Sequence, residues 1–545
     1  MNTTHTTQGV LSLILSAFLV FFILPGCEDA SDGAGSMGMA GSTGEETGSE
    51  GFAGLGVSGS QDFGLFRAIL ENGEIPGSNT IDDVGFFAEH KLEFPAPECG
   101  EDVCLHGSLG VLGNMMTGTA CTMVMFGMNT PIDPAEMERP PLNLVLAIDT
   151  SGSMSGDAIK SVRVGLQLML NHLEPDDHIT LVQYSDHAEV LFENKTLDSI
   201  DEMTAIITGL KAGGATNLYE GLYTALDLVA THAHPEVQNR VILLSDGVAT
   251  KGITSEAKLV ALAEAYASQG VGISAIGVGD SFDVSLMRSI GEKGAGNFYF
   301  LDDVQAVAEV FTDEVNAFLV PVALDVRIQF GVGPGYQVRD AYGSSGWTPL
   351  EHGGTLEIPA LFLAGRTDDT EPATEGRRGG GGAILVEVMP IATEAQEGDI
   401  HDVGHITVTW IDPKTGGLMG ESFTPGPDGT GGPVEFTQNT VVKNPNLPGS
   451  WPEEGTFTDK TSEKGFVMLN LYVAFKMAAE AAESGNFDSA TGILEAIRPN
   501  LVTWLEGTPD ADIEDDLVYV DLFIEALQDQ NPVPITPPEP WPMGD

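Results

Sequence analysis

The stretch LVLAIDTSGSMSGD, Leu144 to Asp157, decides the fold and points to one site. Five apolar residues lead directly into Asp149, and Ser151 and Ser153 follow at alternate positions around a glycine. An unbroken apolar run is typical of a strand that is covered on both faces of its sheet. The polar residues behind it predict that side-chain oxygens gather where the strand ends.

Strand and helix patterns alternate from residue 142 to about residue 320. Between the apolar runs, Leu218, Leu222, Leu226 and Val229 mark one helix by their spacings of three and four. This alternation predicts an α/β fold, a doubly wound and mainly parallel sheet. The further strand candidates are HITLVQYSD, RVILLSDG, VGISAIGVG and NFYFLDD.

Two more oxygen-bearing side chains occupy comparable places. Asp246 ends the run VILLSDG, and Thr216 follows the Gly-Gly pair of KAGGATNLYEGL. Ligands of open parallel sheets bind at the carboxyl ends of the strands, so these residues can join Asp149, Ser151 and Ser153. Two carboxylates and three hydroxyls favour Mg²⁺, Mn²⁺ or Ca²⁺ over zinc or copper. Because hydroxyls are weak ligands, such an ion would bind one more carboxylate strongly, ideally from another molecule.

These five residues resemble the metal-ion-dependent adhesion site of von Willebrand factor type A domains, in the family's order and spacing. The resemblance covers residues 142–320 and implies that Ser151, Ser153 and Thr216 touch the metal directly. It also implies that Asp149 and Asp246 act partly through water. The simpler explanation for Asp149 is a cap on the following helix, but that would not account for five matching oxygens in three loops. In relatives the last helix of the domain, here within DVQAVAEVFTDEVNAFLV, moves when a ligand binds.

Composition excludes several classes of partner. The chain of 545 residues carries 80 acidic and 23 basic residues, a net charge of -57. Nucleic-acid binding needs Lys and Arg to neutralise phosphates, so no nucleic-acid partner is expected. Electrostatic docking on anionic lipid is disfavoured for the same reason. A soluble, self-repelling surface is the simplest interpretation of the excess charge.

The N-terminus has the features of a secretion signal. Residues 10–24, VLSLILSAFLVFFIL, form an apolar run that is short for a membrane span. The following Leu24-Pro25-Gly26-Cys27 resembles the bacterial lipobox, although the chain before it lacks Lys and Arg and Pro25 replaces the usual Ala or Ser. We therefore expect a signal peptide over 1–26, a lipid on Cys27 as membrane anchor, and a location in the bacterial cell envelope, periplasmic or on the surface. The alternative is an ordinary signal peptide cut nearby. No later run is long and apolar enough for us to expect a further membrane span.

The remaining segments differ in character. Residues 27–64 are rich in Gly, Ser and acidic residues and predict a disordered tether. Residues 65–141 form a mixed N-terminal extension, and 321–446 read as a β-rich module, most simply a sandwich. Residues 447–530 are helical, with two helices joined at SGNFD, and 531–545 form a proline-rich tail. Export makes a disulfide among Cys99, Cys104 and Cys121 expected, with its pairing open and one thiol left over.

Three functions remain for the α/β domain. A hydrolase is the least favoured, because Gly152-Ser153-Met154-Ser155-Gly156 places Met154 where a nucleophile elbow needs serine. A metal-dependent binding module predicts a partner that offers Asp or Glu and binding that chelators abolish. A structural scaffold of the envelope, stabilised by the metal, is the alternative. We favour the binding module and expect no catalytic residues.

Overall fold

The structure is a computed structural model, and the residues it describes fall into sixteen ranges. Several predicted features lie outside these ranges: the signal peptide, Cys27, the last helix of the α/β domain and the proline-rich tail. The described ranges are 53–57, 59–60, 63–118, 120–132, 140–234, 237–246, 248–278, 283–301, 321–344, 346–363, 382–391, 402–413, 423–425, 431–433, 435–443 and 456–530.

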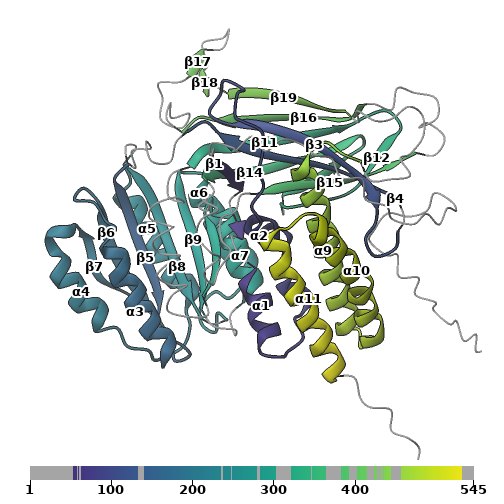
Figure 1. Cartoon of the computed structure of the whole chain (residues 1–545). Coiled ribbons are helices and arrows are strands. Elements are labelled where there is room, and N and C mark those ends of the chain that lie inside the picture. The colour runs from purple at the N-terminus through teal and green to yellow at the C-terminus, as the bar shows by residue number, and fades with distance from the viewer. Residues whose placement is uncertain are drawn as a thin grey trace, which may run out of the picture.

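The predicted α/β domain is built on a seven-stranded sheet (Figure 1). Neighbouring strands are parallel throughout, except that β7 pairs antiparallel with β6 at one edge. The doubly wound, mainly parallel sheet is therefore confirmed, and β2 and β7, one at each edge, are the strands that the sequence did not reveal. In spatial order the strands are β2 (Gly59–Ser60), β10 (Asn297–Leu301), β9 (Val271–Val278), β8 (Gln238–Ser245), β5 (Leu142–Asp149), β6 (His178–Tyr184) and β7 (Ala188–Lys195).

Helices cover both faces of this sheet because its strands are apolar on both sides. Leu144, Leu146 and Ile148 of β5 belong to the core under α3 and α4. The intervening Val145 and Ala147 belong to the core under the other helices. The helices are α3 (Asp157–Leu170), α4 (Ile200–Thr208), α5 (Leu218–Thr231), α6 (Glu256–Ala267) and α7 (Val284–Lys293), with a short 3-10 turn η3 (Leu197–Ser199) before α4.

The β-rich module is one hydrogen-bonded sheet of eleven strands, so the expected sandwich of two sheets is wrong. The sheet curls until β19 reaches β3, where the side chain of Gln438 accepts a hydrogen bond from the Leu105 N–H at 2.8 Å. The strands are β1 (Ala53–Val57), β3 (Cys104–Gly113), β4 (Ala120–Thr130), β11 (Pro321–Val332), β12 (Tyr336–Tyr342), β13 (Trp347–Leu350), β14 (Gly353–Leu363), β15 (Ala383–Pro390), β16 (Asp402–Ile411), β19 (Glu435–Lys443) and β20 (Thr456–Phe457), and β17 (Phe423–Pro425) pairs with β18 (Gly431–Pro433) separately.

The N-terminal residues are shared between these parts, which differs from the expected tether and separate extension. β1 lies between β4 and β14 in the large sheet, and β2 adds to β10 of the α/β sheet. β3 and β4 also belong to the large sheet. Residues within 27–64 therefore contribute to both sheets, and residues within 65–141 contribute to the large one, through pairings that include remote partners such as Leu55 and Leu363.

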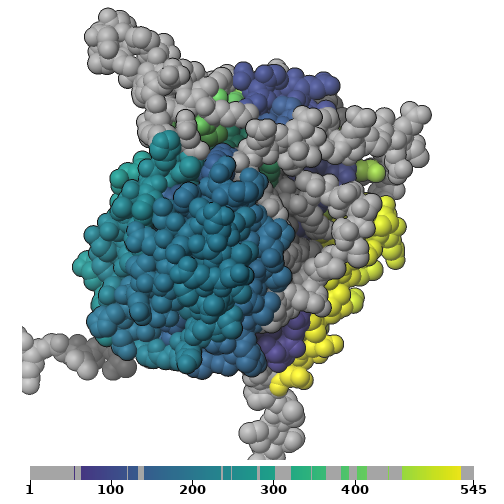
Figure 2. All heavy atoms as spheres, turned by 90° about the vertical axis from the view of Figure 1, so that its left-hand side faces the viewer, coloured from purple at the N-terminus to yellow at the C-terminus, as the bar shows by residue number. Residues whose placement is uncertain are grey.

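The C-terminal region forms a helical bundle with the N-terminal helices α1 (Gly64–Glu71) and α2 (Asp83–Glu89). Figure 2 shows the yellow C-terminal residues beside purple N-terminal ones along one side of the molecule. The predicted junction at SGNFD is confirmed between the first two helices, and a third helix follows. The bundle contains α9 (Lys460–Glu483), α10 (Phe487–Gly507) and α11 (Ala511–Gln530), and a 3-10 turn η1 (Ser78–Thr80) precedes α2.

One described helix corrects the expectation that no later run could span a bilayer. By length and composition α9 passes that test, but 83% of its most apolar window is buried inside the protein. Its burial follows from its position, because Phe466, Leu471 and Phe475 pack among α1, α2, α10 and α11. The apolar surface of α9 is thus explained by the bundle core.

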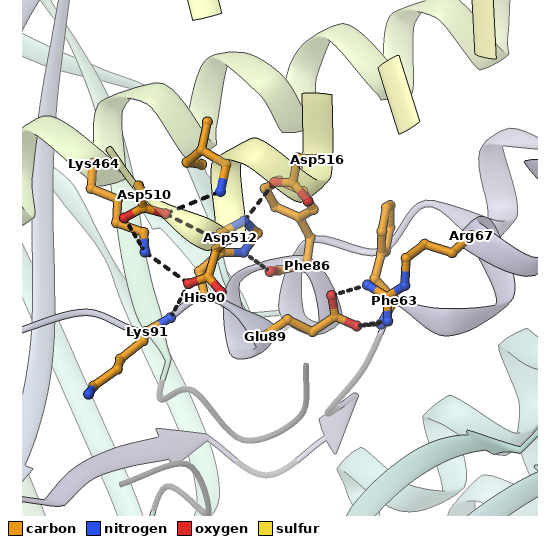
Figure 3. A network of polar contacts seen from close by, with 11 residues as sticks. Phe63, Arg67, Phe86, Glu89, His90, Lys91, Lys464, Asp510, Asp512 and Asp516 are labelled. Carbon is orange, nitrogen blue, oxygen red and sulfur yellow. Dashed lines mark hydrogen bonds and ion pairs between the residues drawn. The ribbon is translucent and has the colours of Figure 1, made fainter. Parts of the chain in front are cut away.

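Buried polar contacts lie within and between the N-terminal and C-terminal helices of the bundle (Figure 3). His90 is fully buried, and its Nε2 lies 2.8 Å from Oδ2 of Asp516 on α11. Lys464 of α9 pairs with Asp510 and Asp512 at 2.8 and 2.9 Å. Arg67 and the buried Glu89 form an ion pair within the N-terminal segment.

The structure contains a disulfide bond between two of the three cysteines that were predicted to form one. Cys99 and Cys104 are bonded to each other, with 5.6 Å between their Cα atoms. Cys121 is not a free thiol, and none of the cysteines in the described residues is. The expectation of one leftover thiol among these three is therefore wrong.

Candidate metal centre

Asp149 ends β5 next to β8, at the point where the sheet order reverses. The chain continues from β5 to β6 on one side, while β8 lies on the other, which opens a crevice at the carboxyl ends. The Asp149 side chain is completely buried. Its Oδ1 accepts from the Ser151 N–H at 2.7 Å, and its Oδ2 accepts from the Ser245 hydroxyl at 2.7 Å. Two donors thus fix the orientation of this carboxylate.

A chain of hydroxyls connects the two site loops. The Oγ atoms of Ser151 and Ser153 lie 2.9 Å apart, and the Ser153 hydroxyl donates to Oδ1 of Asp246 at 2.8 Å. Asp246 follows β8, so these contacts join the loop after β5 to the loop after β8. Four of the five predicted residues are therefore brought together by direct hydrogen bonds between neighbours.

Thr216 reaches the site on a third loop. Gly152 donates to the Gly214 carbonyl at 3.0 Å, and Gly213 donates to the Thr150 carbonyl at 2.8 Å. These backbone bonds hold residues 213–216 against the serine loop, and Gly214 has a φ of +95° that favours glycine. Thr216 is 4% exposed and directly precedes the N-cap of α5.

The electrostatics of the site suit a cation. Burial raises the pKa of Asp149 to about 6, although hydrogen bonds from Ser151 and Ser245 oppose the shift. Burial also raises the pKa of Asp246, against a hydrogen bond from Ser153. Burial is the main cause of both shifts, because the charged form of a carboxylate is poorly solvated in this crevice.

Sequence reasoning missed two residues that support the carboxylates. Ser245 directly precedes Asp246 yet binds Asp149 across the sheet. Tyr184 ends β6, is fully buried, and donates its hydroxyl hydrogen to the Leu244 carbonyl at 2.9 Å. Burial, followed by the charge of Asp149, raises the pKa of Tyr184 well above its usual value. These contacts arise only from the parallel pairing of β5 with β6 and β8, so no local sequence pattern predicts them.

The donor set fits a hard divalent cation. No group of three or more His, Cys, Asp or Glu among the described residues is arranged to hold a metal. The predicted ligand set instead combines two carboxylates with the hydroxyls of Ser151, Ser153 and Thr216, all of which are oxygen donors. Oxygen-only sites prefer Mg²⁺, Mn²⁺ or Ca²⁺.

The segment that resembled a nucleophile elbow does not form one. Met154, at its centre, is completely buried in the core under α3. Ser155 turns back and donates its hydroxyl hydrogen to the Gly152 carbonyl at 2.7 Å. The loop therefore presents Ser153 to Asp246 and holds the other two side chains for packing and turn formation.

The site lies within a region that resembles known proteins. Residues 143–313 match the von Willebrand factor type A domain. The protein YfbK of Escherichia coli is 30% identical over 206 residues, which cover 37% of this chain and 36% of YfbK. Inter-alpha-trypsin inhibitor heavy chain H4 of Bos taurus is 31% identical over 130 residues, 22% of this chain and 14% of that protein. The matched regions thus span about a third of YfbK and about a seventh of the heavy chain.

A solved structure resembles a larger part of the chain. The von Willebrand factor type A protein from Catenulispora acidiphila has a TM-score of 0.47 and 16% identity, over 78% of this chain and 91% of that one. Domains of this family mediate protein–protein adhesion and bind a divalent metal at the adhesion site. Sequence, sheet order and family match agree that this chain contains a von Willebrand factor type A domain.

Proposed function

We propose that the chain binds a protein or matrix partner through a divalent cation held by Asp149, Ser151, Ser153, Thr216 and Asp246. The observation that carries this proposal is the hydroxyl chain from Ser151 through Ser153 to Asp246, at 2.9 and 2.8 Å. It gathers neutral oxygens and one carboxylate at the mouth of the crevice, with Asp149 buried beneath. Mg²⁺ is the expected ion, with Mn²⁺ or Ca²⁺ as alternatives.

The ligand set supports a partner that offers a carboxylate. Two carboxylates balance the charge of a dication, but the three hydroxyls are weak neutral ligands and leave the ion electron-poor. A bound ion would therefore still attract an anionic oxygen, and a partner's Asp or Glu side chain supplies one. The chain itself has a net charge of -57, which would otherwise repel acidic partners. The bound cation would overcome this repulsion locally, so binding of the partner should require the cation. The proposed function is binding rather than catalysis.

A pull-down from detergent-solubilised envelopes tests this proposal. The mature chain serves as bait in Mg²⁺, in chelator, and as the Asp149→Ala variant. Asp157→Ala is the matched control, because the Asp157 side chain lies eight positions away and is 96% exposed. Partners retained only with Mg²⁺, by wild type and by Asp157→Ala, would support ligand capture. The same partners in every lane would refute it.

A second candidate is an envelope scaffold in which the metal only stabilises the fold. The complete burial of Asp149 and its two hydrogen bonds favour this alternative. Chelation would then lower the melting temperature and leave partners bound. We also propose that the chain is lipid-anchored in the bacterial envelope, on the basis of Leu24-Pro25-Gly26-Cys27 and the apolar run before it.

A further inference from the structure

The backbone N–H and C=O groups of Thr216 both form hydrogen bonds with the loop that follows Asp246. The N–H groups of Thr250 and Lys251 donate to the Thr216 carbonyl at 3.0 and 3.1 Å. In return, the Thr216 N–H donates to Oγ1 of Thr250 at 3.0 Å. Residues 250–251 therefore satisfy both backbone groups of a residue whose side chain belongs to the metal site. One site loop fixes the position of another.

Gly252 extends this contact to the start of α5. Its φ is +73°, and a Cβ atom placed on it would lie 2.2 Å from Oδ1 of Asn217. That oxygen caps α5 by accepting from the Glu220 N–H at 3.4 Å. Because only glycine leaves room for Asn217, the close approach of the two loops depends on this residue.

At the protein surface, the loop that follows Asp246 also forms an exposed ion pair. Nζ of Lys251 lies 2.9 Å from Oδ1 of Asp186, which follows β6, and the two side chains are 39% and 53% exposed. Exposed pairs contribute little to stability. The backbone and hydroxyl bonds of Thr250, together with the fit of Gly252, are therefore the main restraints on Thr216.

We propose that residues 250–252 form a clasp that positions Thr216 and thereby sets the metal affinity of the site. The inference rests on the proposed metal-binding function. Hydroxyl oxygens are weak ligands, so their contribution depends on being held in place before the ion arrives. Removing a group that orients a metal ligand typically costs about 10–100-fold in affinity. Thr250 is a positioning residue, because its bonds act on Thr216.

Titration calorimetry of Mg²⁺ into the mature chain tests the clasp directly. Thr250→Val removes the hydroxyl and should weaken Mg²⁺ binding about tenfold, whereas Thr250→Ser keeps it and should bind like wild type. Thr180→Val is the matched control, because Oγ1 of the buried Thr180 also accepts a backbone N–H, from Asn194 at 3.0 Å. It should lose stability without losing Mg²⁺ affinity.

A second pair of variants tests the same clasp through the backbone. Gly252→Ala should weaken Mg²⁺ binding, because its Cβ would collide with Asn217. Gly485→Ala is its control, since Gly485 has a similar φ of +76° but no atom within 4 Å of the added Cβ. Circular dichroism confirms that each variant is folded before titration.

The outcomes separate this inference from the function on which it rests. Binding that Asp149→Ala abolishes, while Thr250→Val and Gly252→Ala retain it at wild-type strength, overturns the clasp and leaves the metal site intact. A wild-type chain that does not bind Mg²⁺ overturns both. Weakening in Thr250→Val and Gly252→Ala, with Thr250→Ser and both controls at wild-type affinity, supports the clasp.

Discussion

Nε2 of His90 lies 2.8 Å from Oδ2 of Asp516, although 426 positions separate the two residues in the chain. The side chains are 0% and 4% exposed. Nδ1 of the same ring donates to the Phe86 carbonyl at 2.6 Å, so the imidazole is held at both nitrogens. The pair therefore joins the end of α2 to α11 inside the bundle (Figure 3).

Replacing His90 should destabilise the bundle strongly. His90→Ala removes the imidazole from a buried pair, a change that typically costs about 3–5 kcal/mol. Urea unfolding followed by circular dichroism measures the loss. Arg498→Ala is the control, because Arg498 and Asp521 form a pair that is 44% and 41% exposed. That variant should lose less than about 1 kcal/mol. Equal losses in the two variants would contradict the structural role assigned to His90.

Asp83 should make stability depend on pH. Burial, and then the neighbouring Asp82, raise the pKa of Asp83 from 3.8 to about 6, against a hydrogen bond from Gly343. The folded state therefore holds this proton more tightly than the unfolded state. Stability from Asp83 should rise as pH falls from about 7 toward 4, and be absent above the folded pKa. Because Asp83 keeps some solvent contact, we expect a gain of about 1–2 kcal/mol.

Asp83→Asn isolates this contribution. The difference in unfolding free energy between variant and wild type, measured from pH 4 to pH 8, should favour the variant most at high pH and shrink on acidification. The experiment also tests the contact between α2 and the α/β domain, because the adjacent Asp82 pairs at 3.3 Å with Arg288 of α7. A difference that stays constant across the range would show that Asp83 titrates normally.

The sequence predicted most of the α/β sheet because five of its seven strands carry their own apolar signal. The run from Leu142 to Asp149 was expected as a strand and forms β5. The site was predictable for the same reason, since Asp149 and Asp246 mark strand ends and Thr216 follows a Gly-Gly pair. Their mutual hydrogen bonds required only that parallel strands end at one edge.

Other features could not be predicted because their partners are remote in the chain. β1 is a short, glycine-rich segment whose role comes from pairing with Met128–Thr130 and Leu361–Leu363. His90 carries no local sign of Asp516, and Thr250 none of Thr216. The Gly, Ser and acidic composition of residues 27–64 predicts a disordered tether. At β1, pairing with remote strands decides the structure instead.

The proposed lipid on Cys27 is open to a direct measurement. Intact mass spectrometry of the chain purified from envelopes should give a mature N-terminus at Cys27 with an added diacylglycerol and acyl chain. Cys27→Ala should abolish that mass and release the chain into the soluble fraction. A thioether-linked lipid and a disulfide use the same sulfur atom. Finding Cys27 in a disulfide, or a mature N-terminus beyond it, would therefore exclude the anchor.

Saturating metal should stabilise the α/β domain. A ligand at 100 times its dissociation constant adds about 2.7 kcal/mol to a state that binds it alone. Differential scanning calorimetry should therefore show a higher melting temperature for this domain in Mg²⁺ than in chelator. Asp246→Asn should abolish the increase, because it removes a carboxylate from the site, while Asp157→Asn should preserve it. Ca²⁺, Mn²⁺ and Zn²⁺ in parallel scans rank the ions, and a melting temperature unaffected by any of them would rule out a metal that binds the folded domain.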